Sequence, residues 1–408
     1  MVIIEHRVDE VAPWADRVVL MDDGRVVLDQ PPRVAWAERG PWLATGVGIP
    51  DTIRLAHAVP DAFGSTLPLS VEEAAEAVRG TWFQTALAAA AAERGQEKQS
   101  AGAGQAQRGG GKSRVGTGPA AAAPVLAWDG VSVEFDGKRA VDDVTLAVGE
   151  GEWVALIGAN GSGKSTLTGL TVGLGKPCAG VVRFRGQLIR PGKVFEHAAQ
   201  VALLLQAADD MLFETTVLKE LEFGFRFRAR PKEPVLDVPE AVEFFGFAGR
   251  EEDSPWELSQ GGRQRLALAA LLVGAPGVLV LDEPTTGQDA DHMRAFLRLL
   301  DRVRARTGIT IVTVTHDIRG LASRAERIVL LGDGQVRADG PASEVFAMTG
   351  DLIRWGVLAP PVARLQSELL GPAATDVLLD VDELASAVLA HRPDAAQAAS
   401  RGAEALRP

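Results

Sequence analysis

Residues 153–165 read WVALIGANGSGKS, an apolar run that leads directly into a glycine-rich loop. The loop fits the pattern G-x-x-x-x-G-K-[ST] from Gly158 to Ser165, and a stretch suited to a helix, 166–172, follows it. Between a buried strand and a helix, such a loop can turn successive backbone N–H groups toward a polyphosphate, at the positive end of the helix dipole. The segment therefore predicts an α/β fold built around a phosphate-binding loop.

The loop residues carry distinct predicted roles. We expect Lys164 to reach the β- and γ-phosphates of a nucleotide and the Ser165 hydroxyl to ligate Mg²⁺. A glycine-rich turn without function is the alternative, but the motif and both flanking elements agree. The chain is thus predicted to be a P-loop NTPase that binds ATP with Mg²⁺. The other loop residues expected around the phosphates are Gly158, Asn160, Gly161, Ser162, Gly163 and Thr166.

A second apolar run ends in two acidic residues. Residues 278–281 read VLVL, and Asp282 and Glu283 follow. A carboxylate directly after a buried strand is placed to hold the Mg²⁺ hydration shell, which is the predicted role of Asp282. Glu283 is the candidate general base for the attacking water. Two such acids often mark only a solvated loop, and the phosphate loop upstream favours the catalytic interpretation.

Residues 258–265 read LSQGGRQR and lie just ahead of this acidic strand. They resemble the signature of the ABC ATPase superfamily, LSGGQ-x-Q-R, at the same place in the chain. Gln260 and Gly262 depart from that pattern. The resemblance implies that Ser259 and Gly261 face the γ-phosphate held by a partner domain's phosphate loop. Without the family, Ser259 is simply a good helix N-cap.

The resemblance assigns further residues in the order in which they occur. Gln206 resembles the Q-loop residue that joins Mg²⁺ to the helical subdomain, and Asp289 resembles the D-loop residue at the dimer seam. His316 resembles the switch histidine that contacts the γ-phosphate. Phe135 stands where the family stacks an aromatic ring on adenine, although core packing explains a strand Phe equally well. The implied catalytic set is Glu283, His316 and Lys164.

Apolar runs alternate with helical stretches from residue 125 onward, as in an α/β fold with a largely parallel sheet. Residues 213–262 favour helices and predict an inserted helical subdomain, and the resemblance adds a small antiparallel β part. We therefore interpret residues 125–350 as one complete nucleotide-binding domain and 351–408 as a C-terminal tail. The expected strands are 125–135, 153–157, 201–205, 278–281, 310–314 and 328–331.

An internal repeat joins the two ends of the chain. Residues 4–31 align without a gap with residues 314–341, at a constant offset of 310 residues. The sequence therefore predicts that residues 1–60 are the C-terminal fragment of a first ABC domain; two unrelated strand–turn–strand units are the alternative. Matching positions include His6 with His316, Arg17 with Arg327, Asp23 with Asp333, Pro50 with Pro360 and Arg54 with Arg364.

Two segments separate this fragment from the complete domain. Residues 61–94 are predicted to be a mostly helical tail. Residues 95–124 are rich in Gly, Ala, Gln and Ser with few large apolar side chains, a composition that predicts a flexible linker.

Composition excludes several classes of protein. The formal net charge of −12 argues against a nucleic-acid partner, because no basic surplus is present to neutralise phosphates. A single cysteine, Cys178, excludes an intramolecular disulfide framework and a Cys-based zinc site. The longest uncharged stretch, 266–281, is too short for a membrane span and is split by a Gly-Ala-Pro-Gly turn at 274–277. Charged residues within the first ten leave no secretory signal.

Shorter similarities point to one branch of the superfamily. Residues 206–213, QAADDMLF, are similar to the QNPDDQLF segment of energy-coupling-factor transporters, and residues 5–7, EHR, resemble their switch loop. The resemblance implies a cytoplasmic ATPase, peripheral on the inner face of the cell membrane, which energises import of a vitamin or metal ion. Its partners would be an integral-membrane subunit and a second nucleotide-binding domain, whether a homodimer, a paralogue or a missing tandem domain. The alternatives are a soluble ABC ATPase outside transport and an ATP-binding remnant with little turnover.

Overall fold

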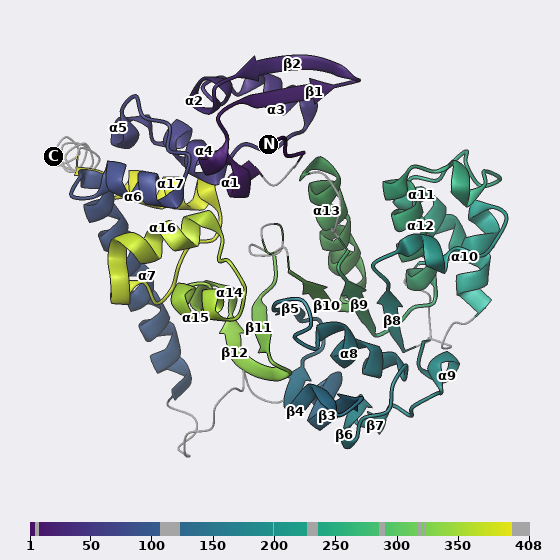
Figure 1. The fold of residues 1–408 in the computed structure, drawn as a ribbon. Helices are drawn as coiled ribbons and strands as arrows, with labels where there is room; N and C mark the ends of the chain where they lie inside the picture. The colour runs from purple at the N-terminus through teal and green to yellow at the C-terminus, as the bar shows by residue number, and fades with distance from the viewer. Residues whose placement is uncertain are drawn as a thin grey trace, which may run out of the picture.

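The computed structural model describes residues 1–4, 8–106, 123–198, 200–226, 236–284, 290–316, 318, 320 and 324–393. Over these residues the strands form a two-stranded, a four-stranded and a six-stranded sheet (Figure 1). The six-stranded sheet has the order β12-β11-β5-β10-β9-β8 and is parallel except for β12. Its strands are β5 (Trp153–Ile157), β8 (Val201–Leu204), β9 (Val278–Asp282), β10 (Thr310–Thr315), β11 (Arg327–Gly332) and β12 (Gln335–Pro341).

The centre of this sheet is buried on both faces. All residues of β5 and β10 are buried, as expected for parallel strands covered on each side. One face packs on the four-stranded antiparallel sheet, where Val154, Leu156 and Val329 share a core with Val131 and Val141. That sheet has the order β4-β3-β6-β7. Its strands are β3 (Leu126–Phe135), β4 (Lys138–Val148), β6 (Ala179–Phe184) and β7 (Gln187–Leu188).

Helices complete the domain. Three of them form a subdomain beside β8 at one side of the molecule, in the region predicted to be helical (Figure 1). The helix α12 opens with the capping residue Ser259, whose Oγ accepts a hydrogen bond from the Gly262 N–H at 3.2 Å. The helices of this part are α8 (Lys164–Gly169), α9 (Val194–Ala198), α10 (Val217–Arg226), α11 (Val238–Phe245), α12 (Gln260–Val273) and α13 (Ala290–Thr307).

The predicted fold class is confirmed: a mainly parallel sheet, an antiparallel β part and an inserted helical subdomain. The predicted linker at 95–124 is wrong in its first part, because α7 (Trp82–Ala106) continues well past residue 94. Alanine, glutamine, glutamate and lysine are good helix formers and outweigh the scattered glycines there. The rest of that linker, 107–122, lies outside the described residues.

The N-terminal segment repeats the end of the complete domain in three dimensions. The hairpin of β1 (Val18–Asp22) and β2 (Arg25–Gln30) has the strand register and bulge position of β11 and β12, shifted by 310 residues. The ion pair of Arg17 with Asp29 recurs between Arg327 and Asp339. The turn residue Asp23 and its counterpart Asp333 both have a positive φ. The remaining helices of the segment are α1 (Val8–Val11), α2 (Pro32–Ala35), α3 (Gly40–Thr45), α4 (Asp51–Ala58), α5 (Pro60–Phe63) and α6 (Val71–Val78).

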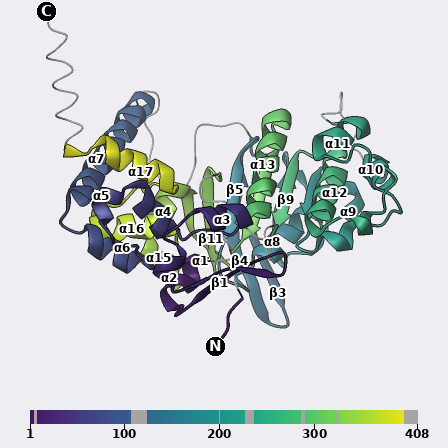
Figure 2. The same cartoon turned by 90° about the horizontal axis from the view of Figure 1, so that it is seen from above.

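Helices from both repeats form one helical unit, seen on the opposite side from the helical subdomain in Figure 2. The contacts are reciprocal: α4 packs on α17, and their repeat counterparts α16 and α6 pack on each other. Arg54 pairs with Asp382, and at the equivalent positions Arg364 pairs with Glu72. The unit thus has the self-complementary pattern of a two-fold interface within one chain. The second repeat contributes α16 (Pro361–Leu370) and α17 (Val381–Ala390) to this unit, whereas α14 (Ala342–Val345) and α15 (Thr349–Arg354) pack in the core of the six-stranded sheet.

The reciprocity gives a test of the helical unit. Leu55 and Leu365 occupy equivalent positions and are both buried in its core. We expect Leu55→Ala and Leu365→Ala each to lower the free energy of unfolding by about 2–5 kcal/mol, because each leaves a cavity. Urea unfolding followed by circular dichroism measures both, with exposed Leu43→Ala as the control. A cost at one position and none at the other would contradict the reciprocal interface.

Candidate nucleotide and magnesium site

The phosphate loop joins β5 to α8 and lies between two backbone segments. A Cβ on Gly158 would lie 2.3 Å from the Leu331 carbonyl oxygen, and a Cβ on Gly163 would lie 2.3 Å from that of Ala140. Gly163 also has a φ of +99°, which glycine adopts readily. Glycine is therefore required at both positions because β11 and β4 approach the loop so closely.

Lys164 is held inside the loop. Its Nζ donates hydrogen bonds to the Gly158 and Ala159 carbonyl oxygens at 2.8 and 2.9 Å, and the side chain is buried. Burial lowers the pKa of the Lys164 ammonium, and the nearby Glu283 and Asp282 oppose this effect. The position suits a cation that meets a phosphate approaching the loop.

Ser165 and Asp282 meet at the carboxyl edge of the sheet. The Ser165 Oγ donates to the Asp282 Oδ1 at 3.3 Å. Burial raises the pKa of Asp282 above its ordinary value, and the hydrogen bond from Ser165 opposes this shift. A hydroxyl and a carboxylate at this spacing are a fitting donor pair for Mg²⁺, which prefers oxygen ligands and keeps several waters.

The candidate base lies against His316, the predicted switch histidine. The His316 Nδ1 is 2.8 Å from the Glu283 Oε2, and the Glu283 N–H donates to the Val314 carbonyl at 2.8 Å. Glu283 has a φ of +51°, a conformation that a non-glycine residue adopts only when its surroundings impose it. The parallel pairing of β9 and β10 thus brings Glu283 and His316 into contact.

The remaining predicted residues differ in how the structure places them. Phe135 ends β3 at the hairpin to β4 and is 59% exposed, so core packing does not account for it. Gln206 is exposed in the loop after β8, and among the described residues no hydrogen bond ties it to Ser165 or Asp282. Gly261 lies against His292, with its ideal Cβ 3.3 Å from the imidazole Cδ2. Asp289 lies outside the described residues.

Two contacts of the signature helix were not predicted from sequence. The Arg263 guanidinium binds the Asp209 carboxylate at 2.7 Å and so links α12 to the segment after Gln206. The Gln264 side chain donates to the Pro284 carbonyl, the residue after Glu283. The LSQGGRQR pattern contains both residues, but only the folded chain shows what they contact.

The helical unit also reaches the phosphate loop. Gly356 follows α15 with a φ of +70°, and its ideal Cβ would lie 3.0 Å from the Cβ of Ala159. Beside it, the Trp355 ring packs on Gly332 and lies under the Arg337 guanidinium, 4.2 Å from its ring centroid. Any outward shift of the loop at Ala159 would therefore press on the start of the helical unit.

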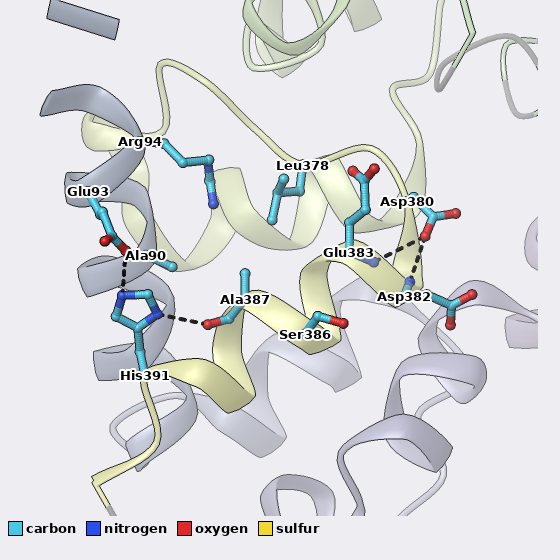
Figure 3. Close-up of a pocket in the computed structure, with 10 residues that line it drawn as sticks. All are labelled: Ala90, Glu93, Arg94, Leu378, Asp380, Asp382, Glu383, Ser386, Ala387 and His391. Atoms are coloured by element: carbon cyan, nitrogen blue, oxygen red, sulfur yellow. Dashed lines mark hydrogen bonds and ion pairs between the residues drawn. The ribbon is translucent and has the colours of Figure 1, made fainter. Parts of the chain in front are cut away.

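A cavity of about 720 Å³ lies between α7 and α17, away from this site (Figure 3). His391 crosses one end, with Nδ1 2.9 Å from the Ala387 carbonyl and Nε2 2.9 Å from the Glu93 carboxylate. Asp380 is engaged in capping α17. None of the predicted nucleotide-binding residues lines this cavity.

Comparison with known proteins agrees with this geometry. Residues 141–286 match the family model described as ABC transporter. An energy-coupling factor transporter ATP-binding protein, EcfA2, from Acetivibrio thermocellus is 33% identical over 250 residues, covering 60% of this chain and 89% of that protein. The fold and site define an ABC-type ATPase domain. The chain belongs to the family of ABC transporter ATP-binding proteins.

Longer relatives and one solved structure add to the comparison. A putative ABC transporter ATP-binding protein of Methanosarcina mazei is 32% identical over 403 residues, covering 96% of this chain. The chain spans 65% of that relative's length. The structure of cbiO1 from Clostridium perfringens, part of the ABC transporter complex cbiONQ, matches with a TM-score of 0.52 and 27% identity. It covers 60% of this chain and 100% of the cbiO1 chain. None of the helices in the described part of the chain combines the length and the apolar character that a membrane span requires.

The position of Lys164 gives a direct test of nucleotide binding. We expect Lys164→Ala to weaken ATP affinity by about a hundredfold or more, because the phosphates lose a charge-assisted hydrogen bond inside the loop. Calorimetric titration with ATP measures the effect. Lys176→Ala is the matched control, since Lys176 is exposed just beyond the loop helix. Equal affinities of the two variants would remove Lys164 from the binding site.

Proposed function

We propose that this chain is the ATP-hydrolysing subunit of an ABC importer of the energy-coupling-factor type. The observation that carries the proposal is the meeting of Lys164, the Ser165–Asp282 pair and the Glu283–His316 pair at one edge of the parallel sheet. The likeness to EcfA2 and cbiO1 supports the narrower assignment.

The residues divide the hydrolytic step between them. Glu283 accepts a proton from water as its oxygen attacks the γ-phosphorus, and the bond to the ADP oxygen breaks. His316 holds the Glu283 carboxylate and is placed to contact the γ-phosphate, while Lys164 offsets the charge on the phosphate oxygens. Mg²⁺ held by Ser165 and Asp282, with Gln206, would supply charge neutralisation at the β- and γ-phosphates. Phe135 provides an exposed ring on which adenine can stack.

One domain supplies only half of each nucleotide sandwich. Ser259 and Gly261 begin α12, and we propose that this end faces the γ-phosphate bound by a second nucleotide-binding domain, with Asp289 at the seam. The contacts of Arg263 with Asp209 and of Gln264 with Pro284 join this signature helix to the Q-loop segment and to the acidic strand. Movement of α12 would therefore shift the backbone beside the proposed catalytic base, Glu283.

Docking of an integral-membrane subunit is proposed beside the Q-loop. The exposed apolar side chains Leu205, Phe213 and Trp256 lie on this segment and at the approach to the signature helix. The buried Glu220 carboxylate accepts hydrogen bonds from the N–H groups of Phe213 and Glu214 at 2.9 and 2.8 Å, and so fixes this surface. The proposed location is the cytoplasmic face of the membrane, and the proposed cargo is a vitamin or metal ion.

We further propose that residues 1–60 are the end of a first ABC domain, so that the protein belongs to a tandem arrangement. The support is the shared register of β1–β2 and β11–β12, the repeated ion pair and the reciprocal helical unit. The relatives aligned along almost the whole chain are also longer than it is.

Turnover is tested at Glu283. We expect Glu283→Gln to bind ATP normally but to lower the rate of phosphate release by about 10²–10⁴-fold, because the amide cannot accept the proton. Glu252→Gln, at an exposed position outside the site, is the control. Phosphate release is followed with the membrane subunit present. An unchanged rate of phosphate release would show that Glu283 is not the general base. If the unsubstituted protein itself releases no phosphate, the chain is better explained as an ATP-binding remnant with an altered signature.

A further inference from the structure

A second cavity lies apart from both the nucleotide site and the helical unit. It opens between the β6–β7 hairpin and α9 (Figure 1). Its volume is about 520 Å³, within the range of roughly 300–1,000 Å³ that small-molecule sites occupy. We call it the hairpin cavity, and its lining residues are Arg183, Gly186, Gln187, Leu188, Arg190, Glu196, His197 and Gln200.

His197 is the buried polar side chain of this cavity. It is only 7% exposed although it belongs to the lining. Its Nε2 accepts a hydrogen bond from the Arg190 backbone N–H at 2.8 Å, so this nitrogen carries no proton. Because a neutral imidazole holds one proton, the proton of His197 is on Nδ1. The side chain is therefore a neutral hydrogen-bond donor.

The contacts of the ring show where this donor points. The Cδ2 atom of His197 faces Gly173, whose ideal Cβ would lie 3.4 Å away. The Nδ1–Cε1 edge is on the opposite side of the ring. Within the part of the chain that the structure describes, no group accepts a hydrogen bond from Nδ1, and protein atoms do not enclose it. The Nδ1–H group is thus available to the cavity.

Arg190 brings a positive charge to the same cavity. The two carboxylates beside the lining have other partners, since Asp129 pairs with Arg183 and Glu196 pairs with Lys193, both at 3.0 Å. The hydrogen bond from Lys193 is the main cause that lowers the pKa of Glu196, and Arg190 contributes only by longer-range attraction. Among the described residues, no ion pair engages the Arg190 guanidinium.

We propose that the hairpin cavity binds a small anionic molecule, either a phosphate ester or a carboxylate. Its anionic group accepts charge-assisted hydrogen bonds from the Arg190 guanidinium and a further bond from the His197 Nδ1–H. The side-chain amides of Gln187 and Gln200 face the rest of the molecule with donors and acceptors. The exposed Leu188 side chain offers an apolar surface beside them.

The position of the cavity separates it from the nucleotide site. The Gln200 carbonyl accepts a hydrogen bond from the N–H of Val278, which begins β9, whereas Asp282 ends that strand at the nucleotide site. The helix α9 packs on β8 and on the short helix η2 (Leu170–Val172), which continues the loop helix α8. A molecule bound here would contact elements that lead to the phosphate loop and to the Q-loop, without occupying either.

Calorimetric titration of the full chain, without nucleotide, tests the proposal. Phenyl phosphate and benzoate carry the two candidate anionic groups on an apolar ring, and phenol is the neutral analogue. We expect Arg190→Gln to weaken binding of the preferred anion by about tenfold or more, because hydrogen bonds to a charged group are lost. Arg185→Gln is the matched control, since Arg185 is on the same hairpin but pairs with Glu150 outside the cavity.

The three compounds separate the outcomes. Binding of phenyl phosphate, of benzoate or of both, at higher affinity than phenol, supports the site and identifies the anionic group. Equal affinity for phenol, no binding of either anion, or an anion affinity that Arg190→Gln leaves unchanged would overturn the proposal. Because no hydrolysis is measured, failure of the proposed ATPase function would not alter this result.

The protonation of His197 gives an independent check. In ¹⁵N NMR of histidine-labelled protein, the protonated and unprotonated imidazole nitrogens give separate signals, and His197→Asn assigns one set among the six histidines. We expect a neutral His197 with its proton on Nδ1, and a shift of the Nδ1 signal when the preferred anion is added. A proton on Nε2, or an Nδ1 signal that stays constant at saturation, would contradict the proposal.

Discussion

The close approach of the phosphate loop to its neighbouring strands constrains the rest of the structure. The carbonyl oxygens of Leu331 and Ala140 stand where a Cβ at Gly158 or Gly163 would have to go. The loop is therefore fixed between the end of β11 and the start of β4, and Lys164 is enclosed with its ammonium on the loop's own carbonyls. Because β9 and β10 run parallel to β5, their carboxyl ends deliver Asp282, Glu283 and His316 to the same place.

Sequence reasoning succeeds where one physical signal dominates. The strands β5, β9 and β10 were predicted to within a residue, because burial on both faces leaves uninterrupted apolar runs. The strands β4, β6, β7 and β12 were not predicted, since alternate or continuous exposure dilutes their pattern. The end of α7 was missed because a composition typical of linkers also contains strong helix formers. At the site, the motif residues were predicted, but the partners of Arg263 and Gln264 depend on tertiary packing that spacing does not reveal.

Strain and contact connect the site to regions far along the chain. Glu283 is held at a positive φ by the hydrogen bond of its N–H to β10, and the next carbonyl, that of Pro284, receives the Gln264 side chain. On the other side, Ala159 meets Gly356 at the start of the helical unit. The phosphate loop, the signature helix and the helical unit are thus linked through short chains of packed residues. Such chains are a physical basis for coupling nucleotide binding to movement.

The reciprocal helical unit has a consequence for assembly. Two identical subunits meet through such an interface only above a certain protein concentration, whereas α4 and α6 are joined to α16 and α17 by one polypeptide. Tethering replaces that dependence by a fixed effective concentration, on the order of millimolar for a flexible connection. The two halves of the helical unit therefore stay together at any protein concentration, and every unit contains one half from each repeat. Unlike identical subunits, they are free to diverge, since a change in one half is not copied into the other.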